Sequence, residues 1–358
     1  MRLEDLQTPT LLIDLDAVAH NLATMHHYLG GNWNRWRPHV KTSKVPAVLE
    51  MLLDAGVRRF KVATSREAEI LLDTAGSRST DLLFAMSMQG ANLERATRVA
   101  QAHPDHRCSM ISETAEHAAQ LKQLGFGIFV DLDPGYHRTG IPMDNRDRID
   151  SVVEAAGDAL VGLHCYDGHL YQTNFADRAA AARSVYAELV ALARTLPTAE
   201  LCTSGTPTFP IALAYEPLQA FEHTVSPGTV VYWDTRSEEL GIDGFACAVQ
   251  VQARVIANPH PDRITMDAGS KALDAAAGDP CASALGPYAL RALTPSEEHL
   301  PMLVLQGSPP AQGTLLRLVP RHVCPTVNLA DEAVLIENGA PREIVAVAAR
   351  GHEVLPEG

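Results

Sequence analysis

The sequence lacks several features that would assign it to a class at once. None of its apolar stretches is long enough to span a bilayer. Its N-terminus has no basic segment followed by an apolar one, so it does not resemble a signal peptide. Lys and Arg number 29 against 43 Asp and Glu, and the formal net charge of −14 argues against binding nucleic acid or anionic lipid through a basic face. We predict a cytoplasmic protein that binds neither nucleic acid nor membrane.

Paired cysteines are also missing. The sequence contains neither a CxxC nor an HxxxH pair, and it shows no internal repeat or low-complexity linker. The six cysteines are scattered, at Cys108, Cys165, Cys202, Cys247, Cys281 and Cys324. This pattern favours reduced thiols or metal ligands over disulfides. It gives no indication of a structural zinc site held by four protein ligands.

Up to about residue 230, short β-rich runs alternate with amphipathic helical stretches. We predict eight strands there, at residues 36–40, 59–64, 81–86, 107–112, 127–133, 160–166, 199–205 and 221–228. Eight strands separated by helices are typical of an α/β fold with a parallel (β/α)8 barrel of the TIM type.

After Tyr232 the pattern changes. Apolar and polar residues alternate there, with Gly, Pro and Asn turns between the runs, which predicts a compact antiparallel β domain. We therefore place a barrel at residues 10–235 and a C-terminal β domain at residues 236–358. A further N-terminal strand, predicted within residues 1–15 and additional to these eight, fits either part.

The active site of a (β/α)8 barrel lies at the C-terminal ends of its strands, so reactive residues directly after the strands are candidates. Lys41 follows the first strand. A lysine in the barrel mouth would be partly desolvated, which favours Schiff-base chemistry, whereas Lys44 is expected to face solvent as most lysines do. Arg138 follows the fifth strand and suits a planar anionic or phenolate partner. Tyr166 ends the sixth and His169 follows it, and a lone histidine there is more often structural.

The last two predicted strands lead into loops that suit a phosphate group. Ser204 and Gly205, at the end of the seventh predicted strand, and Thr206 directly after it offer backbone N–H groups and hydroxyls. At the end of the eighth, Gly228 permits a close backbone approach, and Tyr232 shortly after it offers a hydroxyl. Barrels of this type often bind phosphate between these two loops. Together with a lysine across the mouth, the loops predict a phosphorylated cofactor tethered through an imine, pyridoxal 5'-phosphate.

A histidine and a cysteine stand two residues apart in "RHVCPTVNL". In an extended segment residues i and i+2 point to the same face, so His322 and Cys324 can hold one ion from a short β run. Imidazole plus thiolate suits zinc, with manganese or magnesium as alternatives and the other positions left to water and substrate. On spacing alone, a buried cysteine beside a solvent-facing histidine is the more common arrangement.

In their order, "TPTLLIDLDAV", "RPHVKTSK", "HRTGI", "GLHCYDGHLY", "SGTPT", "SPGTVVYWD" and "HVCPTVNL" resemble the metal-dependent D-serine dehydratases and D-threonine aldolases. Those are pyridoxal-phosphate enzymes of the alanine-racemase fold, and the resemblance covers nearly the whole chain. It implies that Lys41 carries the cofactor, that Arg138 contacts its phenolate oxygen and that Tyr166 lies beside the pyridine ring. It also implies a phosphate site formed by Ser204, Gly205, Thr206 and Gly228.

The resemblance implies a lyase for D-β-hydroxy amino acids that works as a homodimer. Dehydratases of the group resemble this chain in H-x-C, whereas the aldolases more often show H-x-D, so a D-serine dehydratase that forms a keto acid and ammonia is favoured. A D-threonine aldolase that forms glycine and an aldehyde is the alternative. Ser43 stands where the family usually has histidine, which can change proton handling or substrate preference. A racemase, which needs no metal, and a non-catalytic pyridoxal-phosphate carrier, which lacks the β domain, fit less well.

Overall fold

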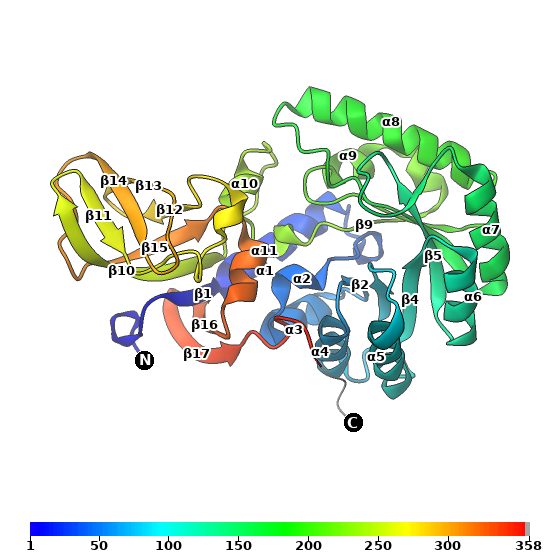
Figure 1. Cartoon of the computed structure of the whole chain (residues 1–358), viewed down its shortest axis with the longest axis horizontal. Coiled ribbons are helices and arrows are strands. Elements are labelled where there is room, and N and C mark those ends of the chain that lie inside the picture. The colour runs from blue at the N-terminus through cyan, green and yellow to red at the C-terminus, as the bar shows by residue number, and fades with distance from the viewer. Residues whose placement is uncertain (355–358) are drawn as a thin grey trace. The chain divides into compact units, whose positions relative to one another are not determined.

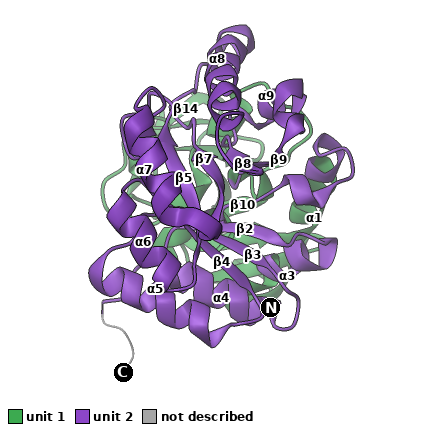
Figure 2. Cartoon of the chain, turned by 90° about the vertical axis from the view of Figure 1, so that its right-hand side faces the viewer, with its two compact units in different colours: residues 1–24, 42–48, 229–351 green, residues 25–41, 49–228, 352–358 purple. Residues whose placement is uncertain are grey.

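The computed structural model describes residues 1–354, and the chain divides into two compact units (Figure 1, Figure 2). The unit that we call the β unit comprises residues 1–24, 42–48 and 229–351. The barrel unit comprises residues 25–41, 49–228 and the described residues from 352 onward. The β unit thus takes in two N-terminal segments as well as the C-terminal part of the chain.

The barrel unit is built on a parallel sheet whose strands follow one another in chain order. These strands are β2 (Arg59–Val62), β3 (Asp81–Phe84), β4 (Arg107–Ser112), β5 (Gly127–Asp133), β7 (Leu160–Cys165), β8 (Glu200–Thr203) and β9 (Glu222–Val225), and a two-residue strand β6 (Ile141–Pro142) pairs with β5. Each of the seven longer strands lies within one of the predicted strands. The predicted fold class, a TIM-type parallel barrel with a β domain, is confirmed.

The first predicted strand is reduced to two isolated bridges. Trp36 pairs with Val225 of β9, and His39 pairs with Lys61 of β2, both in the parallel sense. The Lys61 N–H donates to the carbonyl of Pro38 at 2.9 Å. Pro38 has no N–H group with which to donate a hydrogen bond back to β2, so a regular ladder cannot run through this segment. The predicted strand is therefore correct in position and wrong in regularity.

Helices cover the outside of the parallel sheet (Figure 2). They are α4 (Ser65–Ala75), α5 (Gly90–Ala102), α6 (Ala115–Gln123), α7 (Arg146–Ala156), α8 (Phe175–Ala193) and α9 (Phe209–Ala214). Local sequence sets where several of them begin, because a polar N-cap side chain accepts a hydrogen bond from a backbone N–H in the first turn. The N-cap residues with this bond include Thr64, Thr114, Asn145 and Asn174. Three more helices contain residues of both units: α1 (Leu15–Tyr28), α2 (Val40–Ser43) and α3 (Pro46–Ala55).

A buried ion cluster lies at the N-terminal ends of the barrel strands. The fully buried guanidinium group of Arg37 donates to both carboxylate oxygens of Asp81, at 2.9 and 3.1 Å, and to Glu200 at 3.3 Å. Asp81 and Glu200 are the first residues of β3 and β8. Four side chains of the sheet form an apolar cluster, Leu83, Ile111, Phe129 and Cys202. The ion cluster thus lies at the end of the barrel unit opposite to the C-terminal ends of the strands, where the active site is expected.

Replacing Arg37 with methionine is expected to lower the free energy of unfolding by about 3 kcal/mol. Asp81 and Glu200 would lose their buried partner and keep the exposed Arg107, which lies 3.4 and 3.2 Å from them. Urea denaturation followed by circular dichroism measures this loss. Arg78→Met serves as the control: Arg78 pairs with Glu50 and Asp54 on the surface, and its loss should cost no more than about 1 kcal/mol. Equal losses in the two variants would contradict the role given to the buried cluster.

The β unit is built on a second sheet. Its strands are β1 (Thr10–Asp14), β10 (Val249–His260), β11 (Arg263–Met266), β12 (Ala282–Leu285), β13 (Ala289–Ala292), β14 (Leu300–Gln306), β15 (Leu315–Pro320), β16 (Glu332–Glu337) and β17 (Ala340–Ala346). The main path runs β13-β14-β11-β10-β1-β16-β17, and β15 pairs with β10 and β12. The N-terminal strand β1 therefore pairs in this sheet, antiparallel to β10 and parallel to β16. All other pairs of the sheet are antiparallel, as the alternating pattern predicts.

Two short helices, α10 (Thr235–Glu238) and α11 (Val323–Leu329), complete the β unit. The six cysteines all lie within the described residues and form no disulfide. Among residues 1–354, no helix combines the length and the apolar character needed to cross a membrane.

Candidate functional site

A cavity of about 540 Å³ lies in the barrel unit, where residues at or beyond the C-terminal ends of several strands meet. Lys41, Arg138 and Tyr166 all line it. The structure thus brings three residues predicted from their positions after different strands to one place. Lys61 and His164 line the same cavity and were not singled out in the sequence.

Lys41 is exposed and is the second residue of the short helix α2. Its backbone N–H donates to the His39 ring at 3.3 Å. Lys41 lines the cavity at the barrel mouth, where it was expected. The expectation that Lys44 faces solvent is wrong. Lys44 is only 5% exposed, and its ammonium group donates to the carbonyl of Ala349 within the β unit. Lys44 directly follows α2 and has a positive φ of 51°. Its side chain therefore does not point in the direction that a continued helix would give it.

Arg138 stacks on two aromatic rings. Its guanidinium carbon lies 4.6 Å from the ring centroid of Tyr136 and 5.2 Å from that of Tyr166. The loop that carries it is held by Asp133, which accepts hydrogen bonds from both the backbone N–H and the ring of His137 at 3.0 Å. Burial acts to raise the pKa of Asp133, but these hydrogen bonds outweigh it and hold that pKa below its ordinary value. Arg138 therefore presents a flat cationic face at a fixed place.

The loop after β8 has the features of an anion cradle. Ser204 is fully buried in a left-handed conformation, with φ 56°, and within the described residues its hydroxyl has no hydrogen-bond partner. A Cβ on Gly205 would lie 3.1 Å from the ring of Tyr166, so a side chain there would crowd the ring. Thr206 is buried, and so is Gly228 in the loop after β9. A buried hydroxyl without a partner fits an anionic ligand, since buried polar atoms are rarely left unpaired.

A buried carboxylate supports this loop and was missed in the sequence. Asp167 accepts hydrogen bonds from the Tyr186 hydroxyl at 2.6 Å, from the Thr208 hydroxyl at 2.8 Å and from the Gly205 N–H at 3.3 Å. Burial raises the pKa of Asp167 in spite of these bonds. Asp167 directly follows Tyr166, so one short segment positions both the ring and the loop.

A second buried network, also missed, runs through the cavity wall. The His164 ring Nδ1 lies 2.7 Å from a carboxylate oxygen of Asp131, its neighbour in strand register, and its Nε2 lies 3.3 Å from the ammonium nitrogen of Lys61. Burial, with the charge of Lys41 acting in the same direction, lowers the pKa of Lys61 to about 8. The signal was present: these are ionisable residues inside strands that are otherwise buried and apolar.

In the β unit, His322 and Cys324 lie where β15 leads into α11. His322 is the N-cap residue, with φ −130° and ψ 114°, and Cys324 lies in the first turn of the helix. The expectation of a short β run is therefore wrong. Strand β15 ends at Pro320. Pro325 lies in the first turn of α11, where proline is tolerated because the N–H groups of a first helical turn have no partner within the helix.

Asp234 fixes the orientation of the His322 ring. One of its carboxylate oxygens lies 3.0 Å from His322 Nδ1 and also accepts from the Val323 N–H at 3.0 Å. The other accepts from the Ser237 N–H at 2.8 Å, and the side chain is fully buried. With Nδ1 donating to the carboxylate, Nε2 holds the lone pair, which is the arrangement common to metal-binding histidines.

The Cys324 thiol has two threonine neighbours from the same unit. Its sulfur lies 3.0 Å from the Thr42 hydroxyl and 3.6 Å from the Thr229 hydroxyl. Within residues 1–354, no group of three or more His, Cys, Asp or Glu side chains is placed to hold a metal ion. A site formed by His322 Nε2 and Cys324 Sγ would therefore leave its other positions open to water or substrate.

Tyr232, predicted as a cofactor contact, lies in the β unit. It is fully buried, and its hydroxyl donates to the backbone carbonyl of Ser43 at 2.7 Å. This bond uses the hydroxyl proton and supports the backbone around Ser43, so it does not favour the predicted contact with phosphate.

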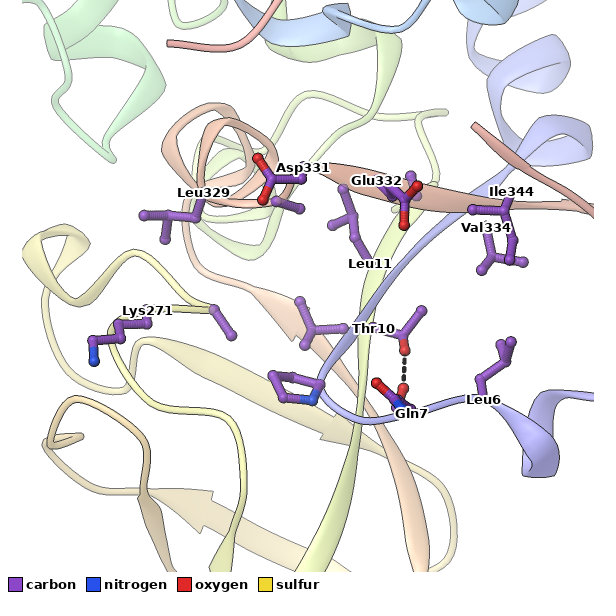
Figure 3. A pocket seen from close by; sticks show the side chains of 15 residues that line it. Leu6, Gln7, Thr10, Leu11, Lys271, Leu329, Asp331, Glu332, Val334 and Ile344 are labelled. Carbon is purple, nitrogen blue, oxygen red and sulfur yellow. Dashed lines mark hydrogen bonds between the residues drawn. The ribbon is translucent and has the colours of Figure 1, made fainter. Parts of the chain in front are cut away.

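The β unit has a cavity of its own, of about 480 Å³, shown in Figure 3. None of the predicted site residues lines it. The hydroxyl of Thr10 donates to the carbonyl of Gln7 there (Figure 3). Lys271 also lines this cavity, and its ammonium group forms ion pairs with Glu297 and Glu298 at 3.1 and 3.0 Å. The cavity of the barrel unit is therefore the better candidate for catalysis.

A parallel barrel sheet with an antiparallel β unit, and a lysine, an arginine and a tyrosine in one barrel cavity, define the alanine-racemase type of fold. Residues 13–236 match the family described as "Alanine racemase, N-terminal domain", and the chain belongs to that family. Residues 248–336 match the family described as "Putative serine dehydratase domain".

Individual relatives match nearly the whole chain. A D-threonine aldolase from Arthrobacter sp is 28% identical over 370 residues, covering 96% of this chain and 93% of that protein. A D-threo-3-hydroxyaspartate dehydratase from Delftia sp. (strain HT23) is 28% identical over 358 residues, covering 90% and 92%. The crystal structure of D-threonine aldolase from Filomicrobium marinum has a TM-score of 0.85 and 27% identity, covering 98% and 97%. The resemblance seen in the sequence motifs is confirmed, and these relatives are lyases of D-β-hydroxy amino acids.

Proposed function

We propose that this protein is a pyridoxal-phosphate- and metal-dependent lyase that acts on D-β-hydroxy amino acids. The cavity in which Lys41, Arg138 and Tyr166 meet is the observation that carries the proposal. The barrel unit would bind the cofactor and the β unit the metal. We further propose that the protein is a cytoplasmic homodimer.

The residues of the barrel unit fit pyridoxal phosphate. The amine of Lys41 would anchor it, Arg138 would face its phenolate oxygen, and the unpartnered hydroxyl of Ser204 would take part in holding its phosphate. When bound, the cofactor withdraws electrons from the α-carbon of an attached amino acid. Lys41 Nζ is then the group that accepts the α-proton.

His322 and Cys324 fit a divalent metal, with zinc favoured and manganese or magnesium as alternatives. A bound ion would polarise the β-hydroxyl of the substrate. Asp234 would keep the His322 ring turned with Nε2 outward. Solved structures of a D-threo-3-hydroxyaspartate dehydratase include a histidine-to-alanine variant and a cysteine-to-alanine variant, the second in a metal-free form, and the two positions are two residues apart as here.

The H-x-C spacing, shared with a relative that is a dehydratase, favours elimination of water to a keto acid and ammonia, as in D-serine dehydratase. Cleavage to glycine and an aldehyde, as by the D-threonine aldolase relatives, is the second candidate, because those relatives match the chain equally well.

The test is a substrate panel on purified protein supplied with pyridoxal phosphate. D-serine, D-threonine and D-threo-3-hydroxyaspartate are each assayed for keto acid, ammonia and glycine, with L enantiomers as controls. We expect equal amounts of keto acid and ammonia from a D substrate, loss of turnover with EDTA and recovery with zinc. Glycine with an aldehyde would favour the aldolase, and no product from any D-β-hydroxy amino acid would contradict the proposal.

A further inference from the structure

The cavity of the barrel unit contains a buried ammonium group for which the proposed function has no use. Lys61 Nζ lies 3.3 Å from His164 Nε2, and His164 Nδ1 lies 2.7 Å from Asp131. Since Asp131 can only accept when ionised, the ring proton is on Nδ1, and Nε2 accepts from Lys61. The carboxylate thus orients the ring, and the ring holds the ammonium group from one side.

Lys61 has more donors than partners. An ammonium group carries three N–H donors, and within residues 1–354 the hydrogen bond to His164 is the one that its nitrogen makes. The ring centroid of Tyr166 lies 5.2 Å away and adds a cation–π contact. The residue is 2% exposed, so most of its hydration is lost. A buried cation in this state is costly unless a further acceptor reaches it.

The charges around the cavity favour an anion as that acceptor. Lys41 and Arg138 line the cavity together with Lys61. The acidic lining residue, Glu113, is already paired with Arg148 at 3.3 Å. Positive charge therefore exceeds negative charge at the wall, which raises the local concentration of small anions.

We propose that Lys61 binds an anionic oxygen at the wall of this cavity, and that His164 and Asp131 position its ammonium group for that contact. The identity of the anion rests on the proposed function: the oxygen is either an oxyanion of the cofactor or the carboxylate of the amino-acid substrate. Lys61 is thereby distinct from Lys41, whose amine forms a covalent bond.

A binding role and a structural role for Lys61 predict opposite effects on stability. Burial is the largest cause that lowers the pKa of Lys61 to about 8, and the charges of Lys41 and Arg37 act in the same direction. Cys202 and Asp131 act to raise this pKa and offset part of the effect. Between pH 8 and the ordinary 10.5 the unfolded chain holds a proton that the folded chain has lost, so this group makes stability rise with pH there. Without ligands, Lys61→Met should therefore be more stable than the natural chain at pH 7, and the difference should shrink between pH 8 and 10.5. A structural lysine would give a less stable variant at pH 7.

The binding test compares the natural chain, Lys61→Met and Lys122→Met, with three ligands. Lys122 is an exposed lysine on α6 that pairs with Asp158, and it serves as the matched control. Acetate, which needs no cofactor, is tested by its effect on the melting temperature of the cofactor-free chain. Pyridoxal phosphate is titrated alone by visible absorbance. D-alanine, which has no β-hydroxyl to lose, is titrated into the loaded protein. Should Lys61→Met not fold, Lys61→Gln is measured in its place.

We expect Lys61→Met to lose the stabilisation by acetate and to bind one of the other two ligands at least about ten-fold more weakly. Weaker binding of pyridoxal phosphate assigns the oxygen to the cofactor; unchanged cofactor affinity with weaker binding of D-alanine assigns it to the substrate. If all three ligands bind as they do to the Lys122→Met control, the inference is wrong. Because none of these readouts requires turnover, an inactive protein would overturn the proposed function and leave this result standing.

Discussion

Replacing Lys41 with alanine is expected to abolish the visible absorbance that pyridoxal phosphate gives to the protein and to lower turnover at least about 1,000-fold. The physical reason is that Lys41 would supply both the covalent anchor of the cofactor and the base at the α-carbon. Absorbance spectra and a coupled assay for keto acid measure the two losses.

Two controls separate this role from general damage. Lys41 is exposed, so the variant should unfold at the same urea concentration as the natural chain. Lys122→Ala, on the outside of the barrel unit, should keep both absorbance and turnover. A Lys41→Ala protein that stays yellow and active would show that another lysine carries the cofactor.

Replacing His322 or Cys324 with alanine is expected to remove the bound metal and at least about 100-fold of the turnover, while the cofactor absorbance stays. Each change removes one of the two donors that the β unit offers. Metal content by mass spectrometry and turnover with added zinc are the measurements. Retention of one zinc per chain by both variants would place the metal elsewhere.

Asp234→Asn extends this test. The amide has nearly the shape of the carboxylate but can no longer fix the His322 ring with Nδ1 as the donor. Metal affinity should fall about 10- to 100-fold, less than in the alanine variants. Because Asp234 also accepts backbone N–H groups, unfolding is measured alongside, and excess zinc should restore turnover only in Asp234→Asn.

The barrel strands were predictable because each is a short apolar run between two amphipathic helices. Residues 107–112 and 127–133 were predicted with the bounds that β4 and β5 have in the structure. The irregularity of the first strand was not predictable, because Pro38 interrupts its ladder and leaves one isolated bridge to β2 and one to β9.

The site was predictable where chemistry follows a strand end. Lys41, Arg138 and Tyr166 were found by that rule and line one cavity. Lys61 and His164 were missed because the rule does not examine strand interiors, although a lysine in "RFKV" is unusual for a strand buried on both faces.

Tertiary contacts set the remaining parts of the site. Asp234 reaches His322 across 88 positions of the chain, and no local pattern announces that contact. A single positive φ at Lys44 turns the chain so that its ammonium group is buried against the carbonyl of Ala349. The pattern of apolar residues in the sequence does not predict this turn.

The central claim is that Lys41 carries pyridoxal phosphate in a cavity that contains a second lysine. Reducing the cofactor-loaded protein with borohydride and mapping the modified peptide by mass spectrometry tests it most directly. The account predicts one pyridoxyl group per chain, on Lys41. A group on Lys61, or no modified lysine at all, would contradict it.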